Sequence, residues 1–236
     1  MSTAPVVPHA QDGTTVAEML GRWYWFQSLA ATHQKRLLSD CYHRDFATDG
    51  YVCQAGEPVR HWLGVIRGLV KLSVMTENGR SAGLAGVTSG GWFGEGSLLK
   101  DEPRRYDAIC LRESRVIFMP AETFHWLRGT SFEFGDFLLN QLNERLSQMI
   151  AAIEHQRLLT PEGRLARCLA WMYHPLLYPN LGDTLGLSQT ELGDLTGLSR
   201  QRVNQALRAL EAAELVKVEY GSVRINSLDG LRTFNG

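Results

Sequence analysis

A short stretch near the C-terminal end constrains the fold of this chain more than any other feature. Ser188 and Glu191 form a capping box, in which a hydroxyl and a carboxylate satisfy the free N–H groups that begin a helix. Gly197 suits the positive φ of a tight turn, and Ser199 caps a second helix. Because Gly193 is small, the two helices can cross closely. Together these residues predict a helix-turn-helix.

The second helix of this motif is predicted to present a polar face to DNA bases. Arginine suits the O6 and N7 atoms of guanine, and asparagine or glutamine suits N6 and N7 of adenine. The net charge of the whole chain is only −1, so contact with nucleic acid requires a local basic patch of this kind. The candidate DNA-binding residues are Ser199, Arg200, Gln201, Asn204, Gln205 and Arg208.

Two short runs after the motif, 215–220 and 222–225, turn at Gly221 and predict a β-hairpin wing. Lys217 and Arg224 on this wing are placed to contact phosphates. The predicted unit, a winged helix-turn-helix DNA-binding domain, covers residues 160–236 and begins where a proline and a glycine interrupt the preceding helix.

A long helix is predicted over residues 132–159, with apolar side chains spaced 3, 4, 3 and 4 apart along one seam. A helix of this length extends about 42 Å, which is more than one face of a small domain can cover. We therefore expect a dimerisation helix whose seam meets a second copy, although a helix packed only on its own chain is the alternative. The candidate interface residues are Leu139, Leu142, Leu146, Met149 and Ile153.

The N-terminal half is predicted to be an antiparallel β-roll. Short β-branched or aromatic runs alternate with glycine-rich turns between residues 45 and 120. The expected strands cover 51–53, 62–66, 69–75, 82–87, 106–110 and 116–119. An effector-sensing domain is thus expected over 15–131, after a disordered tail over 1–14. The predicted fold class is α+β.

The four cysteines lie far apart, which favours neither a disulfide scaffold nor a zinc site and is typical of a reducing cytoplasm. No apolar run approaches the length of a membrane span, and no signal peptide is recognised. We therefore expect a cytoplasmic protein without a membrane partner.

The order of β-roll, long helix and winged helix-turn-helix resembles the Crp/Fnr family of regulators, over residues 15–235. The most specific stretch is Ser188–Leu210, in which Leu-Ser-Arg-Gln-Arg-Val-Asn-Gln-Ala-Leu is similar to the recognition helix of that family. The resemblance implies a homodimeric bacterial transcription regulator that binds palindromic DNA, with recognition helices about 34 Å apart. It also implies allosteric control by a small effector and contact with RNA polymerase. Position 201 is glutamine where many members of the family have glutamate, and position 205 is glutamine where many have arginine, which predicts a half-site different from that of the cyclic-AMP receptor.

The resemblance further implies an effector site, because Phe93-Gly94-Glu95-Gly96-Ser97 is similar to the start of the family's cyclic-nucleotide cassette. The implied effector-binding residues are Gly94, Glu95, Gly96, Ser97, Arg104, Arg105 and Met149. Two departures argue against cyclic AMP. Residues 105–108 lack the family's hydroxyl residue and are one residue longer, and Met149 and Ile150 cannot donate hydrogen bonds to adenine. The effector is therefore unidentified, with cyclic AMP as the alternative.

An enzyme on the β-roll is the alternative from another class. A metal-dependent enzyme of this shape needs a His-x-His pair, and no second histidine follows His61 at that spacing. An iron–sulfur site needs clustered cysteines near the N-terminus, which Cys41 and Cys53 alone do not supply. No catalytic residue and no metal ligand is assigned.

Overall fold

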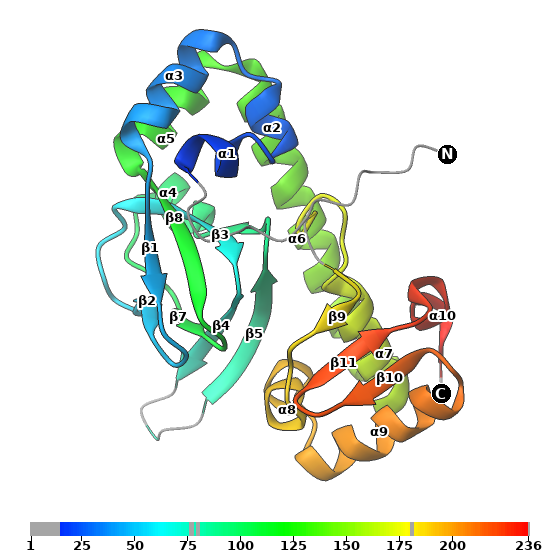
Figure 1. Ribbon diagram of the computed structural model, residues 1–236. Helices are drawn as coiled ribbons and strands as arrows, with labels where there is room; N and C mark the ends of the chain where they lie inside the picture. The colour runs from blue at the N-terminus through cyan, green and yellow to red at the C-terminus, as the bar shows by residue number, and fades with distance from the viewer. Residues whose placement is uncertain (1–14, 76–77, 79–80, 180–181, 236) are drawn as a thin grey trace.

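The computed structural model describes residues 15–75, 78, 81–179 and 182–235. The predicted disordered tail, 1–14, lies outside these residues. The predicted α+β class is confirmed: a β-rich N-terminal domain is followed by a long helix and a C-terminal helix-turn-helix unit (Figure 1). No helix of the described part is both long enough and apolar enough to cross a membrane.

The β-roll consists of two antiparallel sheets of four strands each. One sheet has the order β1-β8-β3-β6, formed by Tyr42–Phe46, Ser114–Pro120, His61–Arg67 and Trp92–Phe93. The other has the order β2-β7-β4-β5, formed by Tyr51–Cys53, Asp107–Cys110, Leu69–Met75 and Ser81–Thr88. Val65, Val70 and Phe118 are among the side chains buried between the sheets. The sequence did not predict β1, since His43, Arg44 and Asp45 conceal its alternation.

Several helices cover the outer face of the first sheet. They are α1 (Val16–Leu20), α2 (Tyr24–Gln27), α3 (Ala31–Asp40), α4 (Glu95–Lys100) and α5 (Ala121–Thr130). A cluster of aromatic rings joins them to the sheet, and the stacked rings of Trp62 and Trp92 have centroids 4.2 Å apart. Trp25 packs on both of these rings and also on Phe134 of the long helix. The cluster fixes the start of the long helix on the β-roll.

The long helix, α6 (Phe132–Leu158), is capped at its N-terminus by Ser131, whose hydroxyl accepts from the N–H of Phe134. It ends before Thr160, which caps α7 (Pro161–Trp171) with Pro161 in the first turn. The C-terminal unit then contains β9 (Thr184–Leu185), α8 (Gln189–Thr196), α9 (Arg200–Ala212), β10 (Val216–Glu219), β11 (Ser222–Ile225) and α10 (Leu228–Thr233). The predicted hairpin β10–β11 gains a third strand, β9, which the sequence did not predict.

The crossing of α8 and α9 follows from the residues that predicted it. The capping box of Ser188 and Glu191 is present, and Gly197 has a φ of 68°. A Cβ added at Gly193 would lie 2.7 Å from the carbonyl oxygen of Leu198, so only glycine permits this close crossing. Leu192 and Val203 are buried between the helices. The local prediction of a helix-turn-helix is confirmed.

Candidate nucleic-acid interface and effector site

The outward face of α9 is open to solvent. Ser199 caps the helix by accepting from the N–H of Arg202, and the buried stripe of Val203, Leu207 and Leu210 faces the domain core. Of the predicted base readers, all are exposed except Asn204, which is half-buried; the exposed ones are Ser199, Arg200, Gln201, Gln205 and Arg208. The helix carries no acidic residue in its first turn. This geometry leaves amide and guanidinium groups free for base edges and phosphates.

The predicted dimer seam runs along one side of α6. Exposed fractions there are 67% for Leu139, 58% for Leu146, 52% for Met149 and 54% for Ile153, while Leu142 is half-buried. Ile150 is 59% exposed on the same helix. The protomer thus exposes a row of large apolar side chains, which is unusual for a helix packed only on its own chain.

Glu95 and Arg104 are the buried charged residues of the predicted effector site. Glu95 is 4% exposed; its Oε1 lies 2.9 Å from Nε of Arg145 on α6, and its Oε2 accepts from Trp62. Arg104 donates to the carbonyls of Gly94 and His61. Gly94 has a φ of 92°, and a Cβ there would lie 2.0 Å from Nη1 of Arg104. Both charged groups are therefore engaged by the chain's own atoms.

The other predicted effector residues do not gather at one point. Ser97 is buried on α4, whereas Gly96 is exposed. The side chain of Arg105 is 74% exposed and pairs with Glu102 at 2.8 Å. Met149 lies on α6 and lines a cavity whose wall also includes Arg145 but not Gly94, Glu95 or Arg104. The structure brings Gly94, Glu95 and Arg104 together and leaves Arg105 and Met149 apart from them.

Arg145 is a residue of this site that the sequence analysis missed. Burial alone would lower its pKa, but the Glu95 carboxylate and the Tyr178 hydroxyl raise it, so the guanidinium stays charged. Arg145 also donates to the carbonyl of Trp92. The sequence did contain one indication of this role. Arg145 lies outside the apolar seam of α6, and a cation that is buried where a helix meets another domain requires an anionic or hydrogen-bonding partner.

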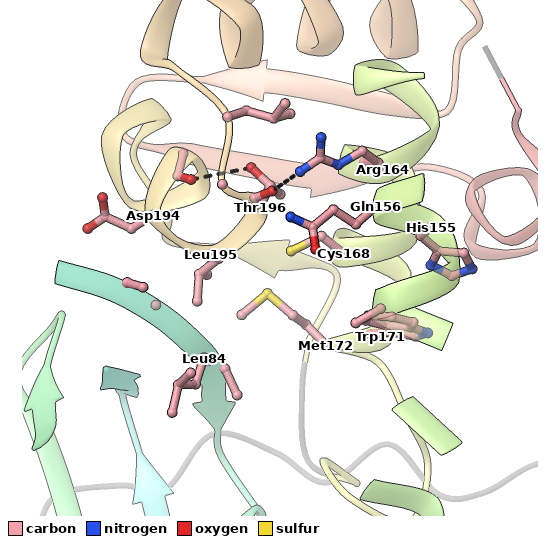
Figure 2. A pocket seen from close by; sticks show the side chains of 18 of the residues that line it. Leu84, His155, Gln156, Arg164, Cys168, Trp171, Met172, Asp194, Leu195 and Thr196 are labelled. Carbon is pink, nitrogen blue, oxygen red and sulfur yellow. Dashed lines mark hydrogen bonds between the residues drawn. The ribbon is translucent and has the colours of Figure 1, made fainter. Parts of the chain in front are cut away.

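A cavity of about 610 Å³ lies between the β-roll and the C-terminal unit. Figure 2 shows Leu84 of β5 on one wall and Trp171 and Met172, at the end of α7, on the other. The Nδ1 atom of His155 and the Nε2 atom of Gln148 are buried and have no hydrogen-bond partner in the described residues. Burial, together with the charge of Arg167, lowers the pKa of His155, which favours its neutral form.

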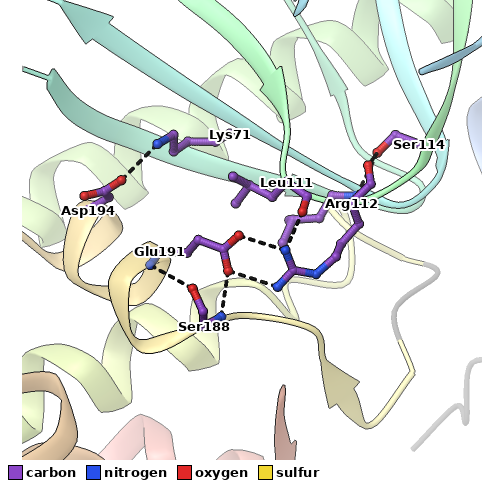
Figure 3. A network of polar contacts seen from close by, with 8 residues as sticks. Lys71, Leu111, Arg112, Ser114, Ser188, Glu191 and Asp194 are labelled. Carbon is purple, nitrogen blue, oxygen red and sulfur yellow. Dashed lines mark hydrogen bonds and ion pairs between the residues drawn. The ribbon is translucent and has the colours of Figure 1, made fainter. Parts of the chain in front are cut away.

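Two ion pairs join α8 to the β-roll, as Figure 3 shows. The guanidinium of Arg112 binds both carboxylate oxygens of Glu191, at 2.8 and 2.9 Å, and Lys71 lies 2.9 Å from Asp194. Burial alone would raise the pKa of Glu191, but hydrogen bonds from Arg112 and Ser188 outweigh it and lower this pKa. The carboxylate that caps α8 therefore also holds α8 on the β-roll.

Comparison with known proteins identifies the family. The profile of the cyclic nucleotide-binding domain matches residues 43–131, and that of the Crp-like helix-turn-helix domain matches residues 163–234. The chain belongs to the Crp/Fnr family. As a Crp/Fnr regulator it acts in transcription, and its relatives are regulators rather than enzymes, so the alternative of a metal-dependent enzyme has no support. Among the described residues no group of three or more His, Cys, Asp or Glu is arranged to hold a metal.

Relatives of this Crp/Fnr regulator span most of its length. Vfr of Pseudomonas aeruginosa, described as a cAMP-activated global transcriptional regulator, is 25% identical over 194 residues, which cover 79% of this chain and 90% of Vfr. The transcriptional regulator SdrP of Thermus thermophilus is 28% identical over 174 residues, covering 71% and 80%. The structure of FixK2 from Bradyrhizobium japonicum is similar in fold, with a TM-score of 0.70, 18% identity and coverage of 83% and 98%.

Proposed function

We propose that this Crp/Fnr regulator is a homodimer that binds palindromic double-stranded DNA through α9 and responds to a small effector at the β-roll. The observation that carries the proposal is the exposed polar face of α9, where Arg200, Gln201 and Gln205 project from a helix whose opposite face is buried. Two such helices, about 34 Å apart in a dimer, match successive major grooves.

Selection from random duplex DNA tests the DNA-binding function. The selected sequences are expected to be palindromic, with half-sites about 10 base pairs apart. Replacing Arg200 with alanine removes a bidentate donor, so it is expected to relax the preference at one half-site position and to weaken binding by about 1–3 kcal/mol. Arg232→Ala is the matched control, since Arg232 lies on α10 and pairs with Asp229. An unchanged sequence preference in Arg200→Ala contradicts this role.

The dimer is supported by the apolar seam of α6, and a second copy is its proposed occupant. Leu139, Leu146 and Ile153 lie seven residues apart, which is two turns of the helix, and two such helices packed together bury the row that one protomer exposes. The equivalent seam of the second copy has the same spacing, which is the self-complementarity that a two-fold axis requires.

We propose that the effector is not cyclic AMP. Vfr is cAMP-activated by its description, but the groups that this chain has for a cyclic phosphate are otherwise engaged. Arg105 faces solvent and pairs with Glu102, and Arg104 donates to backbone carbonyls. Calorimetry is expected to detect no cyclic AMP binding at micromolar concentrations. Micromolar binding accompanied by a shift in operator affinity contradicts the proposal.

We also propose that the regulator works in the bacterial cytoplasm and contacts RNA polymerase from its DNA site. Transcription in vitro, with purified polymerase and a promoter that carries the selected sequence, tests this contact. Transcript levels are expected to change with the wild-type protein and to remain unchanged with Arg200→Ala at the same concentration.

A further inference from the structure

A segment of the C-terminal unit inserts into the core of the β-roll. Residues 174–178, which we call the inserted segment, follow α7 in the chain. Leu177 is 1% exposed and Tyr178 is 5% exposed, and both belong to the same buried cluster as Val87 and Phe93. That cluster fills the space between the two sheets, so two side chains of the DNA-binding half complete the core of the sensing half.

Tyr178 lies at the edge of the β-roll that faces α6. A Cβ at Gly91, between β5 and β6, would lie 2.8 Å from Cδ1 of Tyr178, so the ring packs directly on the backbone there. The Tyr178 hydroxyl raises the pKa of Arg145, whose Nε lies 2.9 Å from the Glu95 carboxylate. The phenol therefore occupies space beside Glu95, one of the residues predicted to bind the effector.

The imidazole of His174 fixes the conformation of the inserted segment. Its Nδ1 accepts from the backbone N–H groups of Leu176 and Leu177, both at 3.3 Å, and its Nε2 lies 3.2 Å from Glu144 on α6. The N–H of Tyr178 also donates to the carbonyl of His174, at 2.8 Å. Since Nδ1 accepts, the ring proton is on Nε2 and points to Glu144. Hydrogen bonds made by His174 therefore hold the inserted segment in this conformation.

We propose that Leu177 and Tyr178 are internal occupants of the effector site, and that an effector binds beside Glu95 by displacing them. This inference rests on the proposed function and names the chemistry of its effector. The site holds an apolar cluster, the Glu95–Arg145 ion pair and the buried Arg104 guanidinium, and the group that the effector would replace there is a neutral phenol. The effector class is therefore a neutral aromatic molecule with a hydroxyl group, which is what Tyr178 presents to Arg145.

Displacement of the inserted segment would move the DNA-binding unit, because the segment is continuous with that unit on both sides. It follows α7, which packs against α9, and it precedes β9, which pairs with the wing strand β11. The effector and Tyr178 cannot occupy the same space. Competition between them therefore couples the β-roll to the recognition helix without any further contact.

Chemical complementation with full-length protein tests the proposal. Tyr178→Ala removes a phenol ring and leaves a cavity, as a truncated core side chain does. Phenol is expected to bind this variant in calorimetry at least tenfold more tightly than it binds the wild type, and more tightly than benzene, which lacks the hydroxyl. Tyr24→Ala is the control, since Tyr24 is 81% exposed and its removal opens no cavity. Equal phenol binding by Tyr178→Ala and wild type overturns the proposal.

Operator affinity, measured by fluorescence anisotropy, tests the coupling. Tyr178→Ala is expected to change the affinity at least threefold, and phenol is expected to restore it while leaving the wild type unaffected. If phenol binds the variant and operator affinity does not respond, Tyr178 is only a packing residue and the proposal fails. If the wild type binds no DNA, the proposed function fails, and the phenol measurement still decides the site.

Tyr178→Phe keeps the inference testable if Tyr178→Ala does not fold. This variant retains the ring and removes only the hydroxyl, the group that raises the pKa of Arg145. It is expected to bind no phenol and to shift operator affinity in the same direction as the loss of the whole side chain. Operator affinity within twofold of the wild type in Tyr178→Phe overturns the proposal in that case.

Discussion

Replacing Gly193 with alanine tests how the helix-turn-helix is held together. The added Cβ would lie 2.7 Å from the backbone oxygen of Leu198, whereas ordinary contact begins at 3.4 Å. The two helices must therefore separate by about 0.7 Å, and no side-chain rotation relieves the contact because the Leu198 oxygen belongs to the backbone. Overpacking of this kind costs about 3 kcal/mol, and the better helix propensity of alanine offsets about 1 kcal/mol. We expect a net loss of about 2 kcal/mol.

Urea unfolding followed by far-UV circular dichroism measures this loss, and operator binding measures its functional consequence. Because separating the helices changes the orientation of α9 relative to α8, operator affinity is expected to fall at least fivefold. Gly135→Ala in α6 is the matched control, since a Cβ there meets no atom within 4 Å, and it is expected to stabilise the protein by about 0.5–1 kcal/mol. A Gly193→Ala protein as stable as the wild type refutes the reasoning.

Three further perturbations follow from the same structure. Leu146→Glu places a charge in the apolar seam of α6 and is expected to give monomers in sedimentation velocity, whereas Tyr24→Glu, outside the seam, is expected to remain dimeric. A double-mutant cycle on Arg112 and Glu191 is expected to give about 1 kcal/mol, since Arg112 is partly exposed and its charge is screened. Because the pKa of Glu191 is lowered in the folded state, this contribution is present at neutral pH and is lost as the pH falls below its ordinary value of 4.5. The Cys41 thiol, whose pKa burial raises to about 12, is expected to resist thiol reagents at pH 8 in the native protein, because the reactive thiolate is scarce there.

Local chemistry explains which parts of the fold could be predicted. Ser188, Glu191 and Gly197 act on backbone atoms within a few residues, so their roles are readable from spacing alone. The start of α6 at Phe132 also follows from a neighbour, the hydroxyl of Ser131. By contrast, β9 has two residues and owes its assignment to pairing with β11, which is far away in sequence. A strand that exists through a distant partner carries no local signal.

The site residues also divide into those that local sequence could predict and those that depend on distant contacts. The polar face of α9 was predictable because exposure alternates with burial along one helix. The partnership of Glu95 with Arg145 was not, since 50 positions separate an α4 carboxylate from an α6 guanidinium and only the tertiary fold brings them together. The same is true of Tyr178, whose apolar neighbours lie in strands about 90 residues earlier in the chain. Its sequence surroundings, rich in proline and leucine, indicate only a connecting loop.

Two glycines in strand β5 allow the C-terminal unit to pack closely on the β-roll. Gly83 and Gly86 interrupt a strand that otherwise favours larger side chains, which by itself weakens the sheet. A Cβ at Gly83 would lie 2.8 Å from the carbonyl oxygen of Asp194, and one at Gly86 would lie 2.6 Å from Cε of Met172. The glycines thus permit α8 and the end of α7 to approach the β-roll. Side chains at these two positions would separate the DNA-binding unit from β5, and would weaken the Lys71–Asp194 contact and the insertion of Tyr178 together. Since Tyr178 and α8 both pack on this side of the β-roll, the proposed displacement of Tyr178 by an effector is also expected to loosen the contacts made by α8.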